Sequence, residues 1–101
     1  MDRIEYFARL AAEEPLAARA RYGYANELLR AGRWEEAAEE LRAYLALGDD
    51  EGNGHGRLAT ALRELGRADE AADAYLAGME AAERHGHHDM ADEFRRAIEE
   101  L

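Results

Sequence analysis

The stretch that decides the fold is Gly32-Arg33-Trp34-Glu35-Glu36-Ala37, which recurs 34 residues later as Gly66-Arg67-Ala68-Asp69-Glu70-Ala71. The same spacing relates Ala25 to Ala59, Leu28 to Leu62 and Ala43 to Ala77. A fixed period of this length is typical of stacked supersecondary units, each of which buries its apolar face against its neighbours. The sequence therefore predicts a repeat protein.

The first residues of the chain follow the same register. Phe7, Leu41 and Tyr75 lie 34 residues apart, as do Leu10, Tyr44 and Gly78. Residues 1–14 are therefore expected to be the second helix of an incomplete repeat. We predict a single domain over 1–101, made of this half repeat, full repeats at 15–51 and 52–86, and a capping helix at 87–101.

The composition favours an all-α fold. Alanine makes up roughly a fifth of the 101 residues, and the β-branched residues are limited to Ile4, Thr60 and Ile98, which leaves little from which to build strands. Glycines follow the periodic apolar stretches, at positions that suit helix C-termini. We expect six antiparallel helices joined by short loops, at about 2–13, 16–31, 34–47, 53–65, 68–85 and 88–100, with Pro15 opening the second and Asn53 capping the fourth.

The last helix is predicted to close the array. Met90, Phe94, Ala97, Ile98 and Leu101 form one apolar stripe, while charged residues occupy its other faces. A terminal element of this kind shields the apolar face of the final repeat from water.

Missing residue types and net charge exclude several functions. The chain contains no Ser, Cys, Lys, Gln or Val, which removes the usual serine, cysteine and lysine nucleophiles and the P-loop lysine, so we expect neither an enzyme nor a cofactor. A net charge of −10 argues against a nucleic-acid surface. The charged start and the lack of a long apolar run predict neither a signal peptide nor a membrane partner, and the absence of cysteine gives no disulfide framework, so we expect a cytoplasmic protein.

The two aligned units resemble the tetratricopeptide repeat, a helix-turn-helix of 34 residues. Tyr24-Ala25 with Leu28, and Leu58-Ala59 with Leu62, match the first-helix pattern, and the two stretches quoted at the outset match the turn and the start of the second helix. The closing proline of the family survives only as Pro15. Because Ala68 and Gly78 also replace larger packing residues, we expect the second repeat to be less tightly packed.

The resemblance implies a non-catalytic module that binds a peptide or helix of a partner protein in a concave groove lined by the first helices. Carried onto this sequence, the groove residues are Arg19, Tyr22, Asn26, Arg30, Asn53, Arg57, Thr60 and Arg63. Spacings of three to four residues place the first four of these on one helix face. The first helices are rich in arginine and the second helices in acids, so we expect an acidic partner segment.

Two alternatives stay open from the sequence. The half repeat could dock onto a second copy through Tyr6, Phe7 and Leu10, which would make the protein a homodimer or a larger assembly. The cluster His85, His87, His88 and Asp89 could bind a metal ion or centre an enzyme, although Gly86 leaves these ligands on a loop and a solvated loop is the simpler interpretation.

Overall fold

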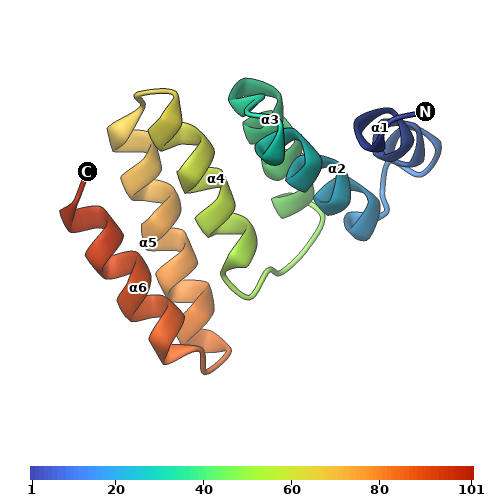
Figure 1. The fold of residues 1–101 in the computed structure, drawn as a ribbon. Coiled ribbons are helices and arrows are strands. Elements are labelled where there is room, and N and C mark those ends of the chain that lie inside the picture. The colour runs from blue at the N-terminus through green and yellow to red at the C-terminus, as the bar shows by residue number, and fades with distance from the viewer.

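A computed structural model describes the whole chain as six α-helices without strands, and the predicted all-α array is confirmed (Figure 1). In chain order the helices are α1 (Arg3–Glu13), α2 (Ala18–Arg30), α3 (Trp34–Leu45), α4 (Asn53–Glu64), α5 (Ala68–Arg84) and α6 (His88–Glu99). Each helix packs on the next one in the chain, so the molecule is elongated and measures 39 × 28 × 18 Å. None of these helices combines the length and the apolarity that a membrane crossing needs.

The repeated Gly-Arg pair ends the first helix of each full repeat. Gly32 and Gly66 have φ angles of 73° and 77°, a left-handed conformation that other residues rarely adopt. The backbone amide that follows each glycine donates to a carbonyl in the last turn of the helix. The Arg33 amide bonds the Leu28 carbonyl and the Arg67 amide bonds the Leu62 carbonyl, each at 2.9 Å. This pattern satisfies the exposed carbonyls of a helix end and reverses the chain into the second helix.

One predicted helix start and one predicted helix cap are wrong. Pro15 and Leu16 form a turn, and α2 begins only at Ala18; the Pro15 carbonyl accepts a hydrogen bond from the Arg21 guanidinium at 2.8 Å. Asn53 is not the cap of α4, since it is already the first helical residue after Gly52.

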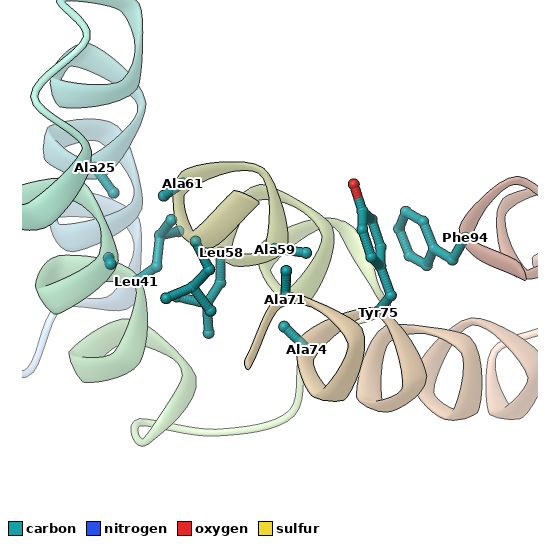
Figure 2. Packing of buried hydrophobic residues seen from close by; sticks show 11 residues of the cluster. Ala25, Leu41, Leu58, Ala59, Ala61, Ala71, Ala74, Tyr75 and Phe94 are labelled. Carbon is teal, nitrogen blue, oxygen red and sulfur yellow. The ribbon is translucent and has the colours of Figure 1, made fainter. Parts of the chain in front are cut away.

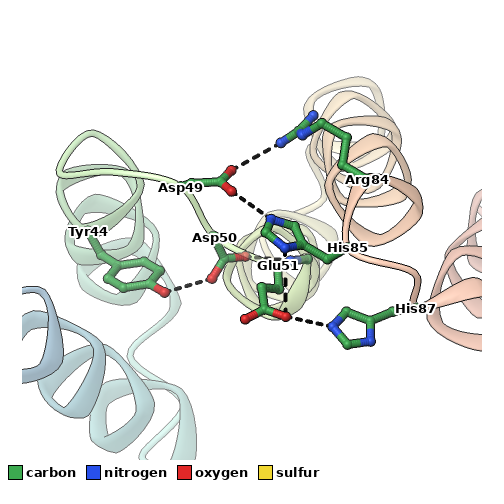
Figure 3. Close-up of polar contacts among 8 residues, drawn as sticks. Tyr44, Asp49, Asp50, Glu51, Arg84, His85 and His87 are labelled. Carbon is green, nitrogen blue, oxygen red and sulfur yellow. Dashed lines mark hydrogen bonds and ion pairs between the residues drawn. The ribbon is translucent and has the colours of Figure 1, made fainter.

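The start of α4 is instead held by Asp50, a buried carboxylate with 7% exposure (Figure 3). It accepts hydrogen bonds from the Gly52 amide at 2.9 Å, the Gly54 amide at 2.8 Å and the Tyr44 hydroxyl at 2.6 Å. Burial and this hydrogen bond raise the pKa of Tyr44 far above its ordinary value of about 10. An ordered polar junction therefore stands where the first repeat lacks a closing proline.

The core runs along the middle of the array, where small residues let helices approach closely (Figure 2). Ala25 and Ala59 are fully buried, as are Ala37 and Ala71 in the facing helices. Leu28, Leu41 and Leu62 are the largest side chains that are fully enclosed. Trp34 is partly buried and packs against this core.

The expectation of a looser second repeat is wrong. Six residues of α4 are buried, against three of α2. Gly78 leaves room for the ring of Phe94 in α6, and the same ring packs against Gly56. A Cβ atom added at Gly56 would lie 2.6 Å from this ring, and one added at Gly78 would lie 2.8 Å from it. Phe94 thus fills the space that the two glycines leave and packs against Tyr75, with ring centroids 5.6 Å apart.

Two histidines between α5 and α6 contact acidic side chains of the loop between α3 and α4, which joins the two full repeats (Figure 3). His85 Nε2 lies 2.6 Å from Asp49 Oδ2, and His87 Nε2 lies 2.7 Å from Glu51 Oε1. The chain holds no group of three or more histidine and acidic side chains placed to bind a metal ion. The two imidazoles share one carboxylate, because His85 Nδ1 also lies 3.9 Å from Glu51 Oε1, and these contacts tie the α5–α6 turn to residues 49–51.

Candidate binding groove

Helices α2, α4 and α6 border three neighbouring hollows. A hollow of about 400 Å³ between α2 and α4 is lined by Asn26, Leu29, Arg30, Trp34, Arg57 and Thr60. A second, of about 320 Å³, opens between α4 and α6 and is lined by Asn53, Gly56, Arg57, Thr60, Arg63, Tyr75, Glu93, Phe94 and Ala97. The third, of about 460 Å³, lies at the start of α4 and is lined by Tyr22, Tyr44, Asp49, Asp50, Glu51, Asn53, His87 and Met90.

Shared residues join these hollows into one surface, which we call the groove. Arg57 and Thr60 line both the first and the second hollow, and Asn53 lines both the second and the third. Every residue predicted for the groove lines at least one hollow except Arg19. That side chain is exposed in the first turn of α2 and lines none of the three.

Arg57 is the residue at the centre of the groove. Its Nε donates to the Tyr22 hydroxyl at 2.8 Å, and its guanidinium carbon lies 5.7 Å from the centre of that ring. Tyr22 in turn packs against Tyr44, with ring centroids 4.7 Å apart. Contacts of this kind orient an arginine without neutralising it.

The arginines differ in whether a carboxylate neutralises them. Between the second helices, Arg42 pairs with Glu70 at 3.0 Å, and Arg67 at the start of α5 pairs with Glu35 at 2.8 Å. In the groove, Arg57 has no carboxylate within 4 Å, and the contact of Arg63 with its neighbour Glu64 is long, at 3.8 Å.

Arg30, the third groove arginine, is partly neutralised by Glu27. The carboxylate of Glu27 is buried and lies 3.4 Å from Arg30 and 2.8 Å from Arg3. The centre of the groove and the end beside Arg63 are therefore its most electropositive parts.

The acids at the opposite end of the groove have partners of their own. Asp49 accepts hydrogen bonds from His85 and Arg84, and these two contacts lower the pKa of Asp49. Glu51 is paired with His87. Glu93 of α6 differs from these acids, since it lines the same hollow as Arg63, between α4 and α6, and has no ion pair.

Sequence reasoning missed one groove residue. Tyr75 comes from α5, a second helix, and so it is not among the residues predicted for the groove. Its ring is buried, but its hydroxyl points out of the core beside Phe94 and lines the hollow between α4 and α6 (Figure 2). Of the aligned residues Phe7, Leu41 and Tyr75, only Tyr75 carries a polar tip, and that difference was the available signal.

The sequence profile of the tetratricopeptide repeat matches residues 4–52 and 25–84. The chain belongs to the tetratricopeptide repeat family. These overlapping matches cover the half repeat and both full repeats, in keeping with the 34-residue period and the helix pairs of the structure. Proteins of this family generally mediate protein–protein interactions.

Among solved structures, a mutant of MamA is similar to this tetratricopeptide repeat chain with a TM-score of 0.67. The two sequences are 22% identical, and the match covers 97% of this chain and 65% of the MamA chain. At this identity the likeness shows a shared fold. No curated protein matches the chain in sequence.

Proposed function

We propose that the protein is a non-catalytic interaction module that binds an acidic segment of a partner protein in the groove formed by α2, α4 and α6. The observation that carries this proposal is the unequal pairing of the arginines: Arg42 and Arg67, between α3 and α5, meet carboxylates, whereas Arg57 and Arg63 keep guanidinium donors free. Arginine forms bidentate, charge-assisted hydrogen bonds with carboxylates, so free donors in a hollow favour an anionic group.

The shape of the surface supports a segment of chain rather than a small molecule. The three hollows are open to solvent and follow one another across three helices. None of them is deep enough to surround a small molecule. Asn26 of α2 also leaves its side-chain oxygen buried without a hydrogen bond beside this surface. This oxygen would accept a hydrogen bond from a backbone amide of a bound segment once the Asn26 side chain turns toward the groove.

A peptide-display selection on the purified chain tests the proposal. We expect selected peptides to be enriched in Asp and Glu, and their binding to be lost in Arg57→Glu. The matched control is Arg42→Glu, which makes the same charge change on a second helix and should leave binding unchanged. Equal loss of binding in both variants, or selected peptides that bind Arg57→Glu as well as the native chain, would contradict the groove.

A second candidate function is self-association through the half repeat. Of the residues expected to serve it, Phe7 and Leu10 are half-buried, and Phe7 packs against Gly23 of α2. Tyr6 remains 52% exposed, and Leu16 nearby in sequence is 83% exposed. Light scattering over a range of concentrations tests this function, with a rising mass expected for the native chain and a constant mass for Tyr6→Ser with Leu16→Ser.

A further inference from the structure

We propose that the hollow between α4 and α6 is a subsite for one carboxylate side chain of the partner segment, with the Tyr75 hydroxyl at its floor as a hydrogen-bond donor. This inference rests on the proposed function and narrows it to one hollow and one chemical group. It also gives a role to Tyr75, which belongs to a second helix.

The Tyr75 hydroxyl is the first observation. Tyr75 is 4% exposed and lines this hollow, yet its hydroxyl forms no hydrogen bond within the chain, whereas those of Tyr22 and Tyr44 do. A hydroxyl held at the floor of a hollow by a buried ring is a rigid donor that only a ligand or water can satisfy.

The charges around the hollow are the second observation. Arg57 and Arg63 lie along one side, on α4, and Glu93 faces them from α6 without coming within 4 Å of either. The lining therefore carries one net positive charge. A single carboxylate would neutralise it, while a densely charged group such as a phosphate would meet the repulsion of Glu93.

The apolar floor favours a side chain over a free ion. The ring of Phe94, which packs on the buried Gly56, and the side chain of Ala97 give the hollow its apolar lining. The methylenes of a glutamate would contact this floor while its carboxylate reaches the arginines and Tyr75. The hollow thus matches an aliphatic stem that ends in an acid.

The subsite can be tested by NMR titration of the native chain with N-acetyl-glutamate N-methylamide, using the glutamine analogue as the uncharged control. We expect saturable shifts at Tyr75 and Arg63 with a Kd on the order of millimolar for the glutamate probe, and none for the glutamine probe. Arg63→Gln should weaken binding by about tenfold and Tyr75→Phe by about threefold.

Two further variants separate this role from a structural one. Glu93→Gln removes the opposing charge and should tighten binding by about threefold, a gain that a damaged fold would not produce. Arg42→Gln, on α3, should change nothing. Equal binding of the two probes, native affinity in Tyr75→Phe, or loss of binding in Arg42→Gln would overturn the subsite.

The two proposals fail in different ways. If display peptides bind the groove but carry no acidic residue at this hollow, and the glutamate probe does not bind, the interaction module stands and the subsite falls. If the glutamate probe binds as expected while no peptide is selected, the subsite stands and groove binding of a protein segment falls.

Discussion

Replacing Asp50 by alanine should destabilise the whole array, because one buried carboxylate closes the junction between the two full repeats. The variant removes the acceptor of the Gly52 and Gly54 amides, a capping loss of about 1 kcal/mol. It also leaves the Tyr44 hydroxyl without its partner, which costs about 1–2 kcal/mol in a partly buried site. The expected total is about 2–3 kcal/mol, or roughly 10–20 °C in Tm for a domain of this size.

Thermal unfolding followed by circular dichroism measures this loss, and Asp49→Ala is the matched control. It removes the same charge one residue away, from a carboxylate that is exposed and screened by solvent, so its effect should be much smaller than that of Asp50→Ala. Tyr44→Phe removes only one of the three hydrogen bonds and should fall between the two. If the Asp50 and Asp49 variants melt at the same temperature, the junction does not depend on the buried carboxylate and the reasoning is wrong.

Three further outcomes follow from the packing and the pKa shifts. Since the pKa of Tyr44 is raised in the folded chain, its contribution to stability is present below about pH 10 and is lost as the pH rises further. Above that pH, the Tm of Tyr44→Phe should therefore fall less steeply with pH than the Tm of the native chain. Because the pKa of Asp49 is lowered by its imidazole and guanidinium partners, its contribution is present above about pH 4 and is lost on further acidification, and Asp49→Asn should flatten that part of the stability profile. Gly56→Ala should destabilise by about 1–2 kcal/mol in urea unfolding, because its Cβ would lie 2.6 Å from the Phe94 ring and the strain exceeds the gain in helix propensity, whereas Gly48→Ala, with nothing within 4 Å, should be neutral.

The helix order could be predicted from sequence because local chemistry determines it. Gly32 and Gly66 fix two helix ends through a left-handed turn that depends on the glycine itself and on the last turn of the same helix. The alanines at a 34-residue spacing then determine which faces come together. Nothing outside each unit is needed for these features, so a single sequence reveals them.

Features that depend on distant partners escaped prediction. Asn53 is the first residue of α4 but not its cap: the amides at this end donate to Asp50, whose carboxylate also accepts a hydrogen bond from Tyr44 in α3. Gly78 suggested loose packing because its partner, Phe94, lies in a helix outside the repeat register. Tertiary contact decided both features, and no spacing rule contains that information.

The groove face was easier to predict than the depth of each residue within it. A spacing of three to four residues identifies a helix face, and so it placed Tyr22, Asn26 and Arg30 along the groove. It could not show that the face of α2 meets the hollows only beyond its first turn, which leaves Arg19 outside. Nor could it show that Tyr75 reaches the hollow between α4 and α6 from α5, because that depends on how α4, α5 and α6 pack together.

A continuous set of contacts links the groove to the junction that orders α4. Arg57 is held by Tyr22, Tyr22 packs on Tyr44, and Tyr44 donates to Asp50, which caps α4, the helix that carries Arg57. The arginine at the centre of the groove is therefore positioned before any partner arrives, and little side-chain entropy remains to be lost on binding. On this argument Tyr44→Phe should weaken peptide binding as well as stability, although Tyr44 contributes no charge to the groove. A Tyr44→Phe variant that is destabilised yet binds selected peptides with native affinity would show that the junction supports the fold alone.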